Sequence, residues 1–141
     1  MENKNLSIYD CSLIQLPKLK ATSGSITVVQ NSAVNLPFAV KRLFYLYDIP
    51  AGKSRGAHAH KECHQLLIPL TGAFEVLLDD GNAKRTVFLN QPFLGLHIPP
   101  GIWASEQNFS SASICLVLTS HEFDEKDYIR NYNEFLNFKN L

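Results

Sequence analysis

The sequence lacks an excess of charge of either sign, because 13 lysine and arginine residues stand against 13 aspartate and glutamate residues. A protein that binds nucleic acid needs a basic face, so we do not expect a nucleic-acid partner. Long hydrophobic runs are also missing, since no apolar stretch approaches the roughly 20 residues of a membrane-spanning helix. Residues 1–5 lack the basic and then apolar pattern of a signal peptide. We therefore expect a cytoplasmic protein with no membrane partner.

Cysteine is scarce and occurs at irregular spacing, as Cys11, Cys63 and Cys115. An odd count favours reduced thiols over a disulfide framework, and buried cysteines behave as small hydrophobic residues. A length of 141 residues suits one domain with a substantial core. We predict a single domain over residues 1–141.

Short segments rich in β-branched and aromatic residues recur along the chain, separated by glycine, proline, asparagine and aspartate. Turn signals at Thr71-Gly72 and Asp79–Asn82 predict two consecutive hairpins through residues 64–90. Regularly spaced short strands are typical of an all-β sandwich or barrel, here over about residues 7–120. The predicted strands are Ser7–Leu16, Ser25–Gln30, Val40–Ile49, His64–Leu70, Ala73–Leu78, Lys84–Asn90, Phe93–Ile98 and Ser113–Thr119.

The apolar spacing changes near the C-terminal end. From Tyr128 onward, apolar residues recur at helical intervals, and Asp124 is a suitable N-cap residue. These features predict one amphipathic helix over Asp124–Phe138, packed against the sheets. The stripe comprises Tyr128, Ile129, Tyr132, Phe135 and Leu136.

Three of the five histidines lie within residues 58–64. In an extended chain, His58 and His60 point to the same side. The spacing alone favours neither of two interpretations: a hydrogen-bonded pair at a rim, or a functional pair. An unperturbed pKa near 6.5 suits imidazoles to proton transfer at neutral pH. His97 and His121 are isolated, and we expect surface or hydrogen-bonded positions for them.

Proton abstraction next to a carbonyl also needs donors that stabilise an oxyanion. Tyr45 and Tyr47 share one face of the predicted strand over Val40–Ile49, and Arg42 lies on the other face. Arg55 precedes the histidines directly and offers a guanidinium group that suits a phosphate.

Two spacings resemble the cupin motifs. Gly52-x5-His58-x-His60-x4-Gln65-x6-Gly72 resembles the first motif, and Pro99-x-Gly101-x2-Ala104-x3-Asn108 resembles the second. The resemblance implies a cupin double-stranded β-helix, a jelly-roll-like barrel, with the C-terminal amphipathic helix added at about 124–138.

The cupin resemblance also bears on metal binding. A divalent metal site in this fold requires about three imidazoles and a carboxylate as ligands. Gln65 stands where metal-binding cupins carry glutamate, and Ala104 stands where the third histidine would lie. We predict no catalytic metal. A metal site stays an alternative, because His64 lies an even number of residues from His58 and His60 and could replace a missing ligand on the same face.

Longer matches extend from about Leu36 to Phe138. Together they resemble the sugar 3,4-ketoisomerases that act on dTDP-4-keto-6-deoxyglucose. The resemblance implies a cofactor-free homodimer that moves a keto group from C4 to C3 of a dTDP-linked 6-deoxyhexose, through an enediol, for surface glycans such as lipopolysaccharide O-antigen. The matching pieces are Leu36-Pro-Phe38, Val40-Lys-Arg42, Arg55-Gly56-x-His58-Ala-His60-Lys61, Gln65, Leu78-Asp-Asp-Gly81, Gly95-Leu96, Trp103 and Phe123-Asp-Glu-x-Asp-Tyr-Ile-Arg-x-Tyr132.

Carried over residue by residue, the resemblance implies that His58 and His60 are the acid/base pair, with His58 as the proton abstractor. Tyr45 would hydrogen-bond the sugar as a third catalytic residue. The implied substrate-binding residues are Arg42, Arg55, Lys61, Gln65 and Trp103.

Two positions depart from the family pattern. Ser23 replaces an active-site arginine, and Ala104 replaces a polar residue that is often histidine. These departures leave open a non-catalytic or diverged nucleotide-sugar binder, a related 3,5-epimerase and, last, a metal-dependent oxygenase.

Overall fold

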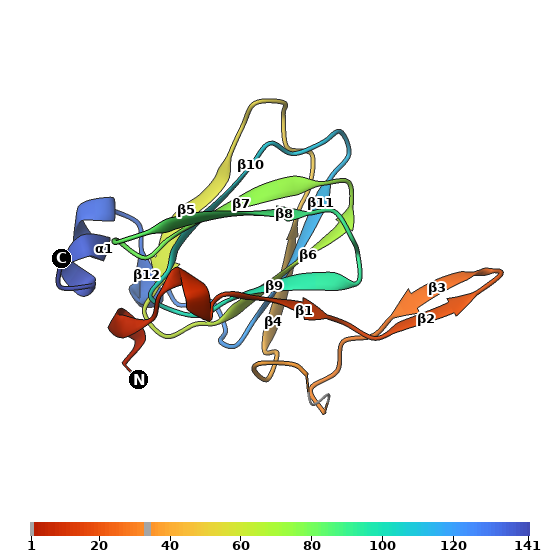
Figure 1. Cartoon of the computed structure of the whole chain (residues 1–141), viewed down its shortest axis with the longest axis horizontal. Coiled ribbons are helices and arrows are strands. Elements are labelled where there is room, and N and C mark those ends of the chain that lie inside the picture. The colour runs from red at the N-terminus through yellow and green to blue at the C-terminus, as the bar shows by residue number, and fades with distance from the viewer. Residues whose placement is uncertain (1, 33–34) are drawn as a thin grey trace.

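The computed structural model describes residues 2–32 and 35–141. Two antiparallel sheets of five strands each face one another, and a two-stranded hairpin projects from them (Figure 1). The order in the first sheet is β1 (Ser12–Gln15), β9 (Leu94–Ile98), β6 (Gln65–Thr71), β11 (Ile114–Thr119) and β4 (Arg42–Leu46). The order in the second sheet is β12 (Tyr128–Ile129), β5 (Arg55–His60), β10 (Trp103–Gln107), β7 (Phe74–Asp79) and β8 (Lys84–Leu89). The hairpin pairs β2 (Lys18–Ala21) with β3 (Gly24–Thr27).

In residues 2–32 and 35–141, helical structure is confined to short segments. Three 3₁₀ turns, η1 (Asn3–Asn5), η2 (Ile8–Asp10) and η3 (Glu125–Asp127), accompany one α-helix, α1 (Tyr132–Phe138). Within the described ranges, none of the helices has the length and apolar character that crossing a membrane requires. The predicted all-β class with a C-terminal helix is therefore confirmed, although the two sheets are not closed into one barrel.

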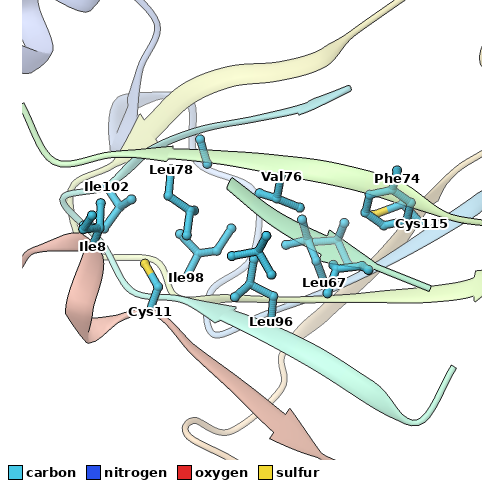
Figure 2. Close-up of a cluster of buried hydrophobic side chains, with 14 residues drawn as sticks. Ile8, Cys11, Leu67, Phe74, Val76, Leu78, Leu96, Ile98, Ile102 and Cys115 are labelled. Carbon is cyan, nitrogen blue, oxygen red and sulfur yellow. The ribbon is translucent and has the colours of Figure 1, made fainter. Parts of the chain in front are cut away.

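The main core lies between the two sheets (Figure 2). Because side chains alternate along a strand, every second residue of β7 faces inward, namely Phe74, Val76 and Leu78. Leu67 and Leu96 of the first sheet meet them from the opposite side. Burial of these apolar surfaces is the main favourable contribution to stability.

Two smaller clusters cover the outer faces. Leu66, Ile68 and Leu118 form one cluster on the first sheet, which explains why β6 is buried on both faces. On the second sheet, Phe135 of α1 packs with Ala59 and the half-buried Trp103.

All eight predicted strand regions contain a strand, but the prediction missed β2, β5, β10 and β12. The region predicted as Ser7–Leu16 divides into η2 and β1, because Ser7 and Asp10 form a capping box that turns the chain. The three cysteines are free and buried, as predicted.

One of the two predicted hairpins is wrong. The β7–β8 hairpin is confirmed, whereas β6 pairs with β9 and β11 and belongs to the other sheet from β7. The turn at Thr71-Gly72 therefore carries the chain across the sandwich. Gly72 has a φ of +76°, and a Cβ there would overlap Ser113 Oγ, so the tight crossing requires glycine.

The predicted helix over Asp124–Phe138 is also shorter in the structure. Asp124 caps η3 rather than α1, because its side chain accepts from the Lys126 N–H group. Tyr128 and Ile129 then pair with β5 as an edge strand, and Asn131 caps α1 by accepting from the Glu134 N–H group. The segment before α1 is not helical, because Tyr128 and Ile129 form backbone hydrogen bonds with β5 and so add a strand to the edge of the second sheet.

Candidate active site

A pocket of about 280 Å³ opens between the two sheets, and we call it the inter-sheet pocket. Its polar groups come from both sheets, so the strand order brings together residues that are distant in the sequence. Apolar side chains of the core, including Leu67, Ile98 and Val117, form part of its lining. The lining residues are Arg42, Phe44, Leu46, Arg55, Gly56, His58, Gln65, Leu67, Ile98, Ala104, Glu106, Val117, Tyr128 and Arg130.

His58 is half-buried in this pocket at the inner face of β5. Burial, together with the neighbouring His60 and Arg130, lowers the pKa of His58 to about 4. The imidazole is therefore neutral at pH 7. A neutral imidazole at the wall of a pocket can accept a proton from a bound molecule.

His60 lies on the same strand but does not line the pocket. Its ring is buried, and its Nδ1 lies 2.9 Å from Asp127 Oδ2. The centroids of the His58 and His60 rings are 5.1 Å apart in an edge-to-face arrangement. Among the described residues, His60 Nε2 has no hydrogen-bond partner. The structure thus brings only one of the two predicted acid/base histidines to the inter-sheet pocket.

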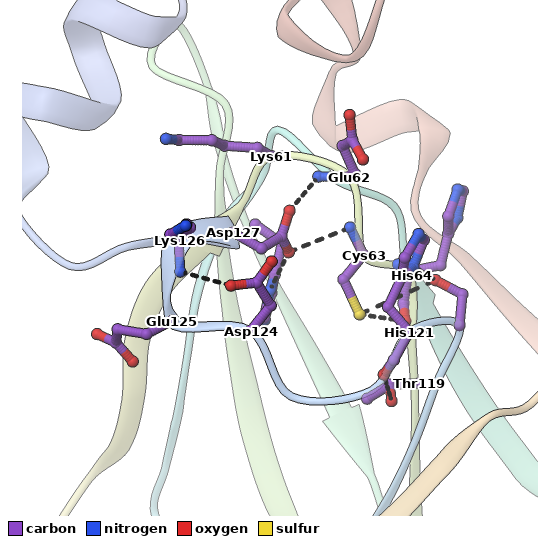
Figure 3. Close-up of polar contacts among 12 residues, drawn as sticks. Lys61, Glu62, Cys63, His64, Thr119, His121, Asp124, Glu125, Lys126 and Asp127 are labelled. Carbon is purple, nitrogen blue, oxygen red and sulfur yellow. Dashed lines mark hydrogen bonds and ion pairs between the residues drawn. The ribbon is translucent and has the colours of Figure 1, made fainter.

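Asp127 is held firmly beside His60. Its carboxylate accepts from the N–H group of Glu62 at 2.8 Å and from that of Cys63 at 3.3 Å (Figure 3). Burial acts to raise the pKa of Asp127, but the hydrogen bonds from His60 and from the two backbone groups outweigh it and lower the pKa. An ionised carboxylate on Nδ1 fixes the orientation and tautomer of the imidazole.

Three arginine residues line the pocket. Arg42 lies 4.5 Å above the ring of Phe44. Arg130 lies 4.3 Å above the ring of Tyr128 and binds Glu125 at 2.7 Å. With Arg55, these groups suit an anion with several oxygens, such as a diphosphate.

Glu106 on β10 is a pocket residue that we did not predict. It is 8% exposed and lies on the inner face together with Ala104, two residues earlier. Burial raises the pKa of Glu106 to about 7, and the charge of Arg55 offsets only part of that effect. Alternation from Ala104 along a strand would have found it, but β10 was not predicted as a strand.

The structure brings Arg42, Arg55 and Gln65 into the pocket with His58. It does not bring Tyr45 there, because alternation along β4 turns that side chain to the outer face, where it is 55% exposed. Tyr45 instead lines a separate hollow of about 410 Å³, which shares Arg55 and Leu46 with the inter-sheet pocket. The expected opposition of Tyr45 and Arg42 across the strand is thus confirmed.

Two other predicted residues also lie elsewhere. Trp103 faces outward from β10, with its ring centroid 5.7 Å from that of Phe135 in α1. Lys61 is exposed beyond the end of β5 and lines a different hollow with Glu2 and Phe138. Neither side chain walls the inter-sheet pocket. Tyr128 and Arg130 of the C-terminal segment take part in the wall instead.

The two positions that depart from the family pattern have different surroundings. Ala104 lines the pocket and is the direct register partner of His58 across β5 and β10. Ser23 lies in the turn of the exposed β2–β3 hairpin, outside the pocket. Of the two, only Ala104 changes the pocket within this chain.

The donors at the cupin metal positions are few. The pocket receives the imidazole of His58 and the amide of Gln65, while Ala104 offers no donor atom. His64 is not a substitute, because its Nδ1 lies 2.9 Å from Nε2 of His97, outside the pocket. That contact and the 2.7 Å contact of His121 Nδ1 with Ser120 Oγ confirm hydrogen-bonded positions for His97 and His121.

One other group of metal-binding atoms occurs in the described part of the chain. The ligand atoms of His60, Cys63 and Asp127 lie within 4.8 Å of one another. The Asp127 carboxylate there already accepts from the His60 ring and from backbone N–H groups. Hydrogen bonding therefore accounts for this cluster.

Comparison with known proteins identifies several relatives. Residues 9–140 match the family model described as FdtA: WxcM-like, C-terminal. The chain is 38% identical over 135 residues to the TDP-4-oxo-6-deoxy-alpha-D-glucose-3,4-oxoisomerase of Aneurinibacillus thermoaerophilus, covering 96% of this chain and 91% of the relative. Among solved structures, QdtA, a sugar 3,4-ketoisomerase from Thermoanaerobacterium thermosaccharolyticum in complex with TDP, is similar with a TM-score of 0.91 and 32% identity, over 95% of this chain and 97% of that one. A 3,4-ketoisomerase from Helicobacter canadensis has a TM-score of 0.89 and 38% identity, over 93% and 98% of the two chains.

Proposed function

This chain belongs to the FdtA, WxcM-like family, and on that basis we propose that it is a TDP-sugar 3,4-ketoisomerase. Its substrate would be a TDP-linked 4-keto-6-deoxyhexose. The observation that carries the proposal is a neutral, half-buried His58 in an arginine-lined pocket of a chain whose relatives are named for this reaction.

In the proposed reaction, His58 removes the proton from C3 of the sugar. The electrons of the C3–H bond form the C3–C4 double bond of an enediol as the C4 oxygen gains a proton. The C3 hydroxyl then loses its proton to give the new carbonyl, and His58 returns a proton to C4. A low pKa keeps His58 unprotonated at the start of this cycle.

His60 and Asp127 support His58 in this proposal. The His60 ring meets the His58 ring edge to face, and Asp127 fixes the His60 ring. Arg42 and Arg55 would bind the diphosphate of the nucleotide, and Gln65 would bind the sugar.

We propose that the reaction is metal-independent and uses no cofactor. The supporting observation is the donor set at the cupin metal positions, because one imidazole, one neutral amide and an alanine are a poor set for a divalent ion.

The test is turnover of TDP-4-keto-6-deoxyglucose in deuterated water, followed by NMR. We expect a 3-keto product that carries deuterium at C4. No product under conditions in which an authentic ketoisomerase works would refute the function. Inversion at C3 or C5 without movement of the keto group would identify the epimerase alternative instead.

We further propose that the protein is a single-domain homodimer. Leu43 and Tyr45 of β4 are exposed, as is Tyr47 just after the strand, and the projecting hairpin exposes Leu19 and Ile26. Exposed apolar patches of this kind mark interaction surfaces. A second copy of the chain is the partner that we propose for them.

The proposed location is the cytoplasm, and the proposed role is in the supply of deoxysugars for surface glycans. The supporting observation is the set of three free cysteines, which suits a reducing compartment.

A further inference from the structure

Glu106 is a buried carboxyl group that the proposed mechanism does not yet use. It lines the inter-sheet pocket from β10, on the strand directly beside the one that carries His58. It is 8% exposed, and its carboxyl receives a hydrogen bond from its own backbone N–H group but, within residues 2–32 and 35–141, from no other residue. A buried carboxyl can accept more hydrogen bonds than this one, so its presence at a pocket suggests further partners that arrive with the ligand.

The surrounding backbone makes room for this carboxyl. Gly56 lies opposite on β5, and a Cβ at that position would overlap Glu106 Oε2. The charge of Arg55 acts on the carboxyl, but the two side chains do not form one of the ion pairs present in the described chain. Burial favours the neutral acid, so both the protonated and the ionised form are accessible near neutral pH.

The ketoisomerase reaction moves protons at oxygen as well as at carbon. His58 accounts for the hydrogen that leaves C3 and the hydrogen that arrives at C4. It does not account for the proton that the C4 oxygen gains or for the one that the C3 oxygen loses. A group that can both donate and accept a proton is needed beside these two neighbouring oxygens.

We propose that Glu106 is the catalytic residue that transfers the proton between the two oxygens. This assignment rests on the ketoisomerase function proposed above. The protonated carboxyl gives its proton to the C4 oxygen as His58 removes the C3 proton and the enediol forms. The resulting carboxylate then takes the proton of the C3 hydroxyl as the C3 carbonyl forms and C4 is protonated. Glu106 ends the cycle protonated, and the electrons stay within the sugar throughout.

The test is the variant Glu106→Gln, assayed with TDP-4-keto-6-deoxyglucose in deuterated water. The amide keeps the shape of the side chain and can donate a hydrogen bond to the C4 oxygen, but it cannot take the proton from the C3 hydroxyl. We expect formation of the 3-keto product to fall by about 10²-fold or more. Deuterium entering C3 of the recovered substrate should fall by less than about tenfold, so the ratio of exchange to product formation rises.

Two further variants complete the test. Glu75→Gln in β7 is the matched control, because Glu75 accepts from Gln107 and Asn108 outside the pocket; both of its rates should match the wild type. Glu106→Asp retains a carboxylic acid, so its ratio of exchange to product formation should stay near that of the wild type.

The outcomes separate the two proposals. If the wild type neither exchanges C3 hydrogen nor forms product, the proposed function fails. If the wild type is active and Glu106→Gln keeps full product formation, or loses exchange and product formation in parallel, Glu106 is not the proton-transfer group. Should Glu106→Gln fail to fold, a changed ratio in Glu106→Asp would overturn the assignment.

Discussion

At the scale of single residues, the pocket depends on the neutral state of His58. Replacement of His58 by asparagine removes the group that accepts the C3 proton but keeps a polar side chain of similar reach. We expect His58→Asn to lower kcat by about two to four orders of magnitude with little change in KM. The matched control is His121→Asn, because His121 is exposed and lies outside the pocket. Unchanged turnover in His58→Asn would remove His58 from the role.

The pH dependence of the wild type follows from the same residue. His58 must be neutral to act as a base, and its pKa is lowered to about 4. The acid limb of the profile of kcat/KM should therefore fall only near pH 4. A fall centred near pH 6.5, the ordinary histidine value, would contradict this assignment.

Asp127 supplies a prediction about stability. Its pKa is lower in the folded chain than the ordinary value of 3.8, so it stabilises the fold above that pH. The contribution is lost as the pH falls through the lower folded value. Asp127→Asn should therefore reduce the free energy of unfolding at pH 7 by about 1–2 kcal/mol, and by less at pH 3. Urea unfolding at the two pH values measures the difference, and an equal loss at both would show that the ionised carboxylate is not responsible.

At the scale of elements, alternation decides which predicted residues reach the pocket. The sequence was sufficient to place Arg42 opposite Tyr45 on β4, and the structure agrees. The family resemblance nevertheless implied that both residues belong to the nucleotide-sugar site. Within one copy of the chain, the two side chains lie on opposite faces, because residues an odd number of positions apart on a regular strand point to opposite faces.

The sequence-based prediction missed β5 and β10 for the same physical reason. β5 and β10 are strands whose polar side chains face a pocket, so they lack the apolar pattern that strand prediction uses. Because β10 was not predicted as a strand, the prediction did not show that Glu106 faces the same side as Ala104, two residues earlier. The aromatic spacing from Tyr128 onward is typical of a helix. Tyr128 and Ile129 nevertheless form a strand, because pairing with β5 outweighs the local preference for a helix.

Lys139 joins three separated elements at one end of the sandwich. It is buried, and its Nζ donates to the carbonyl of Leu6 at 2.5 Å and to that of Gly101 at 2.9 Å. Lys139→Met keeps the apolar stem but leaves both carbonyls without this donor. We expect a loss of roughly 2 kcal/mol in the free energy of unfolding, measured with urea.

Lys126→Met, at an exposed position, is the control and should change stability by less than about 0.5 kcal/mol. Equal stability of the two variants would show that the contacts of Lys139 contribute nothing.

At the scale of the whole molecule, the hairpin and α1 project on opposite sides of the sandwich (Figure 1). Leu19 and Ile26 pair across the hairpin, and each is 61% exposed. If this surface meets a second copy, the double variant Leu19→Lys/Ile26→Lys should halve the mass measured by sedimentation equilibrium. Its thermal unfolding as a monomer should remain cooperative, because neither side chain belongs to the buried clusters.

Phe88→Lys provides the control for this experiment, since Phe88 is also exposed but lies on β8 of the second sheet. Its mass should equal that of the wild type. A wild type that sediments as a monomer, or a double variant that remains a dimer, would exclude the hairpin as the contact.

The sheltered hydrogen bond between His60 and Asp127 offers a spectroscopic probe. Because the ring is only 6% exposed, the proton on its Nδ1 should exchange slowly with water and give a resolved downfield signal in a one-dimensional proton spectrum. Two rings that line the inter-sheet pocket lie against the His60 ring, with centroid distances of 5.1 Å for His58 and 4.3 Å for Tyr128. During a titration with nucleotide analogues, the shift of this single resonance would then report whether a ligand in the inter-sheet pocket changes the hydrogen bond between His60 and Asp127.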